Sequence, residues 1–186
     1  LALLNNAELV TQRQKQYAND IGADYILFQY DSTYKKFFNN IKKRFTEISE
    51  YDIVNFYKHR VMRNLADEYN YVCYLDFDVV PNTNDCIFTS HNVDNMLAVA
   101  ESNRLAIRGK VMKSEDYNLC IRNPATKYWN THALLMEDGY DPENDVFNTG
   151  IMAASSEVIK QLDYFRDFEY IIKRMTEVKH DEFSMY

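Results

Sequence analysis

The chain has 186 residues, and its 21 Lys and Arg against 28 Asp and Glu give a formal net charge of −7. This charge argues against a nucleic-acid-binding surface, which needs a basic patch, and the length predicts a single domain over residues 1–186. No apolar run approaches the ~20 residues of a transmembrane helix, and no signal peptide is recognisable. We therefore expect a cytoplasmic protein, in the host cytoplasm if the source is a virus, and a start at Leu1 without Met suggests truncation at one or both ends.

The first 30 residues show a strand, a helix and a second strand. In chain order they predict a strand stub at Leu1–Leu4, a helix from Asn5 or Asn6 to about Asp20 stopped by Gly22, and a strand at Ala23–Gln29. A strand, a helix and a strand in this order favour a right-handed βαβ unit.

Two amphipathic helices are expected next. Over Asp31–Glu50, apolar residues recur at helical steps around a strongly basic middle, which we interpret as a solvated face. Over Asp52–Tyr69, apolar residues again recur at steps of three and four. The second helix leads directly into the strand at the centre of the chain.

The central strand is Tyr71–Leu75, five apolar or aromatic residues that read as a strand buried on both faces, as in a parallel sheet. Asp76 and Asp78 follow it, before Pro81 ends any ladder. Ligands gather at the carboxyl ends of strands in open α/β sheets, and paired carboxylates suit a hard cation such as Mg²⁺ or Mn²⁺. The two aspartates share a face if the strand persists; if the chain turns at Phe77, they grip different parts of one ligand.

The second half of the chain alternates again between strand-like and helical patterns. They predict a strand at Asn95–Ala100, a strand or irregular crossing at 104–113, a helix at 124–136 that closes at Gly139, a strand at 145–154, a helix at 157–162 capped by Ser155 and Ser156, and a helical run at 165–177.

Three motifs in order resemble those of GT-A nucleotide-sugar glycosyltransferases. Asp76-Phe77-Asp78 after its apolar strand resembles the DxD motif, Val146–Met152 resembles the "fNtGvm" strand, and Asp181-Glu182 resembles a late acidic pair. The resemblance implies an α/β protein with a GT-A-like Rossmann-type mixed, mostly parallel sheet flanked by helices. It implies a glycosyltransferase, hexosyltransferase-like and of a small viral or bacterial type, that uses Mn²⁺ or Mg²⁺. Inversion and retention of the sugar configuration both stay open.

The resemblance also implies a role for each motif. It assigns Asp78 and Asp76 to the metal, with Asp76 and Phe77 also on the nucleotide sugar. It assigns further nucleotide contacts to Leu4 and Asn5 and to the basic residues Lys58, His59 and Arg60. It assigns acceptor binding to Asn148, Thr149 and Gly150. The catalytic carboxylate would be Asp181 or Glu182. The implied partners are a UDP- or GDP-sugar donor, with UDP favoured, and a glycan or protein-linked acceptor.

Two alternatives compete with this interpretation. The strand with its DxD also resembles the first motif of haloacid-dehalogenase-type phosphatases, with Val80 in the last place of DxDx(T/V). That family keeps this strand early and follows it with a Gly-Asp-containing acidic loop, which the sequence lacks. The second alternative is a non-catalytic nucleotide-binding module of the same fold, which hydrolysis of a sugar donor would distinguish from an enzyme.

Overall fold

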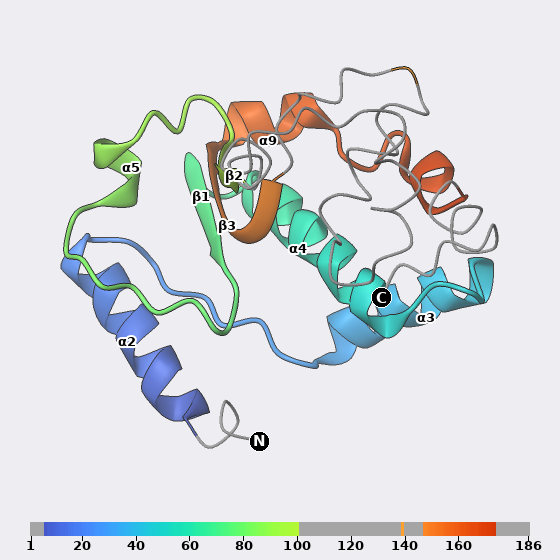
Figure 1. Ribbon diagram of the computed structural model, residues 1–186, viewed down its shortest axis with the longest axis horizontal. Helices are drawn as coiled ribbons and strands as arrows, with labels where there is room; N and C mark the ends of the chain where they lie inside the picture. The colour runs from blue at the N-terminus through green and yellow to red at the C-terminus, as the bar shows by residue number, and fades with distance from the viewer. Residues whose placement is uncertain (1–5, 101–138, 140–146, 174–186) are drawn as a thin grey trace, which may run out of the picture. The chain divides into compact units, whose positions relative to one another are not determined.

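The computed structural model describes residues 6–100, 139 and 147–173 of the chain. Its helices are α2 (Ala7–Asp20), α3 (Ser32–Arg44), α4 (Glu50–Leu65), α5 (Ile87–Ser90) and α9 (Ser156–Leu162), and its strands are β1 (Tyr71–Leu75), β2 (Leu97–Ala100) and β3 (Phe147–Ser155) (Figure 1). The described residues fall into two compact units. The first comprises the chain up to Ala98 together with Thr149–Tyr164, and the remainder belongs to the second.

Helix α2 confirms the first predicted helix and its stop signal. It starts after Asn6, whose side chain makes no capping hydrogen bond; Asn5, the other predicted start of the helix, lies outside the described residues. Val10, Gln14 and Tyr17 form its buried face. The helix ends at Asp20, and Gly22 just beyond it adopts a φ of +71°, a left-handed conformation that glycine reaches without strain from a Cβ atom.

The predicted strand at Ala23–Gln29 is wrong, because this segment joins no ladder in the described part of the chain. Ile26, Leu27 and Phe28 are 42%, 45% and 41% exposed. A β-forming sequence becomes a strand only where a neighbouring strand accepts its backbone hydrogen bonds. Here the segment instead lines a cavity together with β1.

The long amphipathic region predicted at residues 31–50 is shorter than expected, since α3 ends at Arg44. The Asp31 side chain accepts a hydrogen bond from the Tyr34 backbone N–H and so caps the start of α3. The chain then turns, and the Ser49 side chain caps α4 in the same way through the Asp52 N–H. Helix α4 confirms the second predicted helix, with its end at Leu65.

The three strands form one sheet in the order β1-β3-β2, and β1 pairs antiparallel with β3. The register places Tyr71 opposite Ser155 and Leu75 opposite Ile151. All three strands were predicted, but β1 is not buried on both faces as expected, because Tyr71 is 45% exposed at its start. The described residues therefore form a mixed structure of helices and a small antiparallel-paired sheet.

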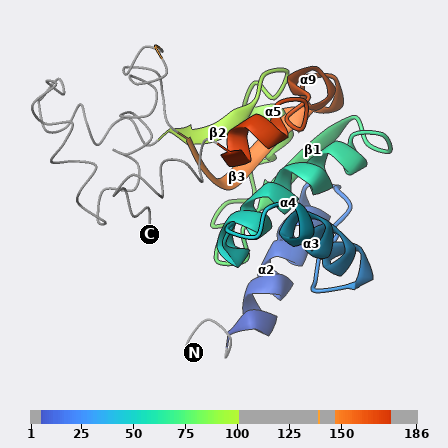
Figure 2. The same cartoon turned by 90° about the vertical axis from the view of Figure 1, so that its right-hand side faces the viewer.

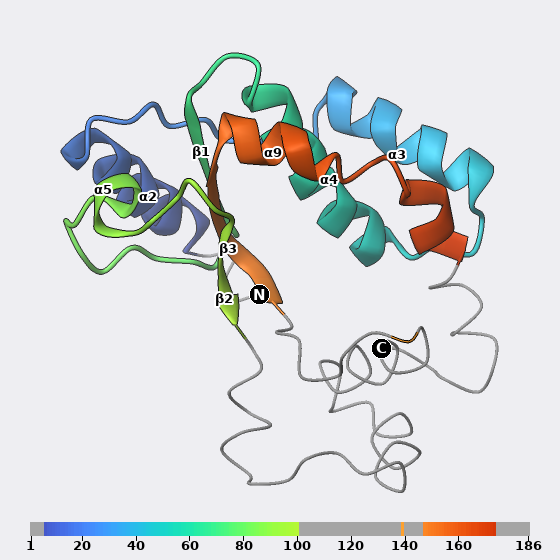
Figure 3. The same cartoon turned by 90° about the horizontal axis from the view of Figure 1, so that it is seen from above.

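Helix α4 packs on β1 and on α9, and the core of the first unit lies between these elements (Figure 2). Its buried cluster draws on α4, the sheet and α9: Met62, Ala66, Val72, Met152, Ala154 and Ile159. On α2, the Tyr17 hydroxyl accepts a hydrogen bond from the Ile87 N–H, which places α2 beside α5 (Figure 3). Helix α4 thus packs directly on the strand that leads into Asp76 and Asp78.

Among the helices that the structure describes, none has both the length and the apolar character of a membrane-spanning segment. The helix predicted at 124–136 lies outside the described residues, as do the strand stub at Leu1–Leu4 and the segment at 104–113.

Candidate active site

The two aspartates of the DxD motif lie in a tight turn rather than on a continued strand. Strand β1 ends at Leu75, and the Asp76 N–H still donates to the Gly150 carbonyl at 2.7 Å. The Val79 N–H then donates back to the Asp76 carbonyl at 3.0 Å, which closes the turn. Phe77 and Asp78 are exposed at its tip. The structure therefore supports the alternative in which the chain turns at Phe77.

Lys58 of α4 forms an ion pair with Asp76. The Lys58 Nζ lies 2.7 Å from Asp76 Oδ1 and 2.9 Å from Oδ2. The Lys58 side chain is only 7% exposed and that of Asp76 30%. An ammonium group that is nearly removed from water requires such a partner, so this contact fixes Asp76 against the buried face of α4.

Tyr74 is the second group that holds Asp76. Its hydroxyl donates to Asp76 Oδ1 at 3.0 Å, and residues two apart on a strand share a face. The Lys58 Nζ also lies 5.5 Å from the centre of the Tyr74 ring. Burial, followed by the charges of Asp76 and Asp78, raises the pKa of Tyr74 well above its ordinary value. Tyr74 therefore keeps its proton and acts as a hydrogen-bond donor.

Lys58, His59 and Arg60 point in different directions, as expected from helical pitch. Lys58 faces Asp76, whereas the His59 ring stacks on Tyr164 of the first unit, with centroids 3.8 Å apart and planes 12° apart. Arg60 is exposed. Burial, and secondly the charge of Lys58, lowers the pKa of His59 to about 4. Of the three basic residues, Lys58 is the one whose contact with the DxD turn the structure shows.

We predict that His59 makes the protein less stable in mild acid. The pKa of His59 in the folded protein, about 4, lies below its ordinary value of 6.5. Between pH 4 and pH 6.5, His59 is therefore protonated in the unfolded chain and neutral in the folded protein. Stability is then lost as the pH falls through this window. Between pH 7 and pH 5, the free energy of unfolding measured in urea should fall by about 2 kcal/mol more for the parent than for His59→Phe.

Phenylalanine is the informative replacement because it keeps a flat ring against Tyr164 and removes the titrating group. His91 is exposed, and His91→Phe is the matched control, which should retain the pH dependence of the parent. If His59→Phe and the parent lose the same stability between pH 7 and pH 5, the buried neutral state of His59 is disproved.

The acceptor-binding residues predicted on the third motif lie on β3. Thr149 is half-buried and Gly150 is buried, and the hydrogen bond from Asp76 to the Gly150 carbonyl joins this motif to the DxD turn. Asn148 is half-buried and is the last residue of β3 that is assigned to the second unit. Leu4 and Asn5 of the predicted base-binding loop and the acidic pair Asp181 and Glu182 lie outside the described residues.

The sequence of the chain matches one protein family over most of its length. The family model described as "Glycosyl transferase family 8" matches residues 6–182. The chain belongs to glycosyl transferase family 8. It is a glycosyltransferase, and the phosphatase alternative is set aside. No curated protein and no solved structure matches the chain.

The DxD turn of this family 8 glycosyltransferase offers oxygen ligands that suit a hard cation in their chemistry. Mg²⁺ is commonly held by one or two carboxylates, with substrate phosphates and water completing its shell. The Asp78 carboxylate shows no hydrogen bond or ion pair to another described residue, and each Asp76 oxygen has lone pairs left beside Lys58 and Tyr74. Over the described ranges, no three His, Cys, Asp or Glu side chains converge as a metal site.

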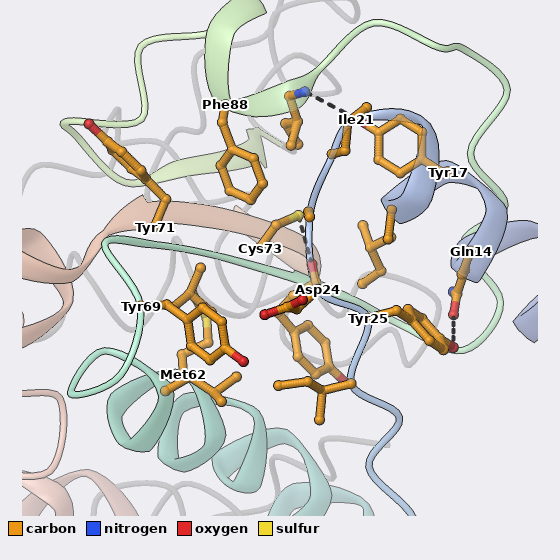
Figure 4. Close-up of a pocket in the computed structure, with 18 of the residues that line it drawn as sticks. Gln14, Tyr17, Ile21, Asp24, Tyr25, Met62, Tyr69, Tyr71, Cys73 and Phe88 are labelled. Carbon is orange, nitrogen blue, oxygen red and sulfur yellow. Dashed lines mark hydrogen bonds between the residues drawn. The ribbon is translucent and has the colours of Figure 1, made fainter.

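A cavity of about 510 Å³ lies beside the strand that carries the motif. It is lined by β1, the end of α2, the segment 21–28 and part of α4, and neither Asp76 nor Asp78 borders it (Figure 4). Cys73 also faces it, and burial raises the pKa of this thiol to about 12, so it is not a nucleophile at neutral pH.

Sequence reasoning missed two polar side chains that hold the DxD turn of the glycosyltransferase. Tyr74 was recognisable, because a residue two positions before Asp76 lies on the same strand face. Gln14 also left a signal, since it occupies the helical position between Val10 and Tyr17 on an otherwise apolar face of α2. A polar residue at such a position requires buried hydrogen-bond partners.

Proposed function

We propose that this glycosyltransferase moves a sugar from a nucleoside-diphosphate donor to a glycan or protein-linked acceptor in a metal-dependent reaction. We favour a UDP-sugar over a GDP-sugar, and a single GT-A-like catalytic domain with a mostly parallel sheet over residues 1–186. The observation that supports this best is the turn at Asp76–Val79. It presents Asp78 to solvent while Lys58, Tyr74 and the Gly150 carbonyl fix Asp76.

The two aspartates would have different tasks. Asp78, exposed at the tip of the turn, would be the firmer metal ligand, and Asp76 would turn its remaining lone pairs to the metal or the ribose. Mn²⁺ or Mg²⁺ bound here would neutralise the charge that develops on the departing nucleoside diphosphate. Lys58 would hold the Asp76 carboxylate in its orientation, and Gly150 would leave room for a sugar ring between the two motifs.

The test is binding of UDP and hydrolysis of UDP-sugars, each measured with Mn²⁺ and with a chelator. We expect calorimetric binding of UDP that requires Mn²⁺, and slow donor hydrolysis without acceptor. GDP and GDP-sugars serve as the matched comparison for the choice of base. Metal-independent binding of UDP would contradict the proposal, and Mn²⁺-dependent binding without any turnover would identify the non-catalytic alternative.

We propose Asp181 or Glu182 as the carboxylate at the reaction centre, because the resembled family keeps an acidic pair at this place in its motif order. A group that acts mainly in the transition state affects transfer more than donor binding. One of the variants Asp181→Asn and Glu182→Gln should therefore lose transfer while it binds UDP like the parent. Parent rates of transfer in both variants would exclude the pair, and Asp141 and Asp145 would be tested next.

A further inference from the structure

Helix α2 reaches the DxD turn through Gln14. The Gln14 Nε2 donates to the Asp76 carbonyl at 3.0 Å and to the Val79 carbonyl at 2.8 Å. These carbonyls stand at the two ends of the turn, so one side chain bridges the residues that flank Phe77 and Asp78. The neighbouring Arg13 Nε donates to the Pro81 carbonyl at 3.2 Å, just beyond the turn.

The amide of Gln14 is itself fixed in orientation. Its Oε1 accepts a hydrogen bond from the Tyr25 hydroxyl at 3.1 Å, which Figure 4 shows as a dashed line. If the amide were turned over, its oxygen would face two carbonyl oxygens and its NH₂ group would lose both acceptors. Gln14 is 5% exposed, and a buried amide that loses such partners is strongly disfavoured. The turn therefore has one arrangement relative to α2.

We propose that Gln14 is a positioning residue for the DxD turn, which sets the Asp78 carboxylate for cation binding before the cation arrives. This inference rests on the proposed metal-dependent function. Gln14 bonds to the backbone carbonyls of Asp76 and Val79, so it would act on Asp78 through the turn. Partners that orient metal ligands in this way commonly control metal affinity, whereas a side chain with only a packing role controls stability alone.

Gln14→Met tests the proposal, since methionine has nearly the same length and helix preference but donates no hydrogen bond. We expect its Mn²⁺ dissociation constant, measured by electron paramagnetic resonance, to rise about 10-fold or more. In the metal-free protein, we expect the Val79 amide to exchange its hydrogen faster, because the turn that protects it loses its bridge. Gln12→Met is the matched control on the same helix, since the side chain of exposed Gln12 bonds to Glu8 of that helix, and it should behave like the parent.

Tyr25→Phe decides the matter if Gln14→Met does not fold, because it removes only the hydroxyl that orients the amide. It should shift both readouts in the same direction by a smaller factor. Parent values for Mn²⁺ affinity and Val79 exchange in folded Gln14→Met, or in Tyr25→Phe where Gln14→Met does not fold, would overturn the positioning role, even with a lowered Tm. Asp78→Asn, measured alongside, separates the two hypotheses: if it binds Mn²⁺ like the parent, the proposed metal site itself is wrong.

Discussion

Asp78→Asn should lower the affinity for UDP in Mn²⁺ to the value that the parent shows in a chelator. Asparagine keeps the shape of the side chain but removes the charge, and Asp78 is exposed at the tip of its turn, so little of the fold depends on it. Loss of a charged ligand contact of this kind corresponds to about a 10- to 100-fold weaker complex. Calorimetric titration of UDP into both proteins, with and without Mn²⁺, measures the effect.

Asp94→Asn is the control for this prediction. Asp94 is also exposed and lies outside the DxD turn, and its substitution removes the same single charge from a protein of net charge −7. It should bind UDP like the parent if the effect belongs to the site rather than to the overall charge. An Asp78→Asn protein with the Mn²⁺-dependent affinity of the parent would show that the motif does not bind the metal.

Local signals in the sequence predicted the elements around the site well. The stop at Gly22 acts through the nearest turn of backbone, so its effect is readable without the rest of the fold. The Asp76-Phe77-Asp78 motif likewise depends on the strand directly before it. The helical spacing of Lys58, His59 and Arg60 also predicted that at most two of them face the site.

The features that failed depend on segments far apart in the chain. Ala23–Gln29 has strand-forming residues, but whether it becomes a strand depends on a neighbour that the sequence pattern does not specify. The antiparallel pairing of β1 with β3 joins residues about 80 positions apart, and apolar runs alone do not specify strand direction. The bridge from Gln14 to the Asp76 and Val79 carbonyls spans more than 60 positions and requires the fold.

The Lys58–Asp76 ion pair leads to the second large effect, an asymmetric loss of stability. Asp76→Asn leaves the ammonium of Lys58 without an opposite charge, and that side chain is 7% exposed. Removal of one partner from a buried pair costs roughly 3 kcal/mol or more. Lys58→Met instead leaves the Asp76 carboxylate without its cation, but this carboxylate is 30% exposed and keeps its hydrogen bond from Tyr74. The free energy of unfolding should therefore fall by about 1.5–3 kcal/mol.

Urea unfolding of both single variants and of the double variant at pH 7 measures this asymmetry. The loss of unfolding free energy in the double variant should be about 0.5–3 kcal/mol smaller than the sum of the two single losses, because the double variant buries no unpaired charge. Arg63→Met is the control: Arg63 pairs at 3.1 Å with the exposed Asp67 just beyond the end of α4, and its loss should leave stability near that of the parent. Equal losses from Lys58→Met and Asp76→Asn that add in the double variant would show that the charges are solvated independently. In that case Asp76 would be free to meet a ligand without Lys58, and the orienting role proposed for the lysine would be wrong.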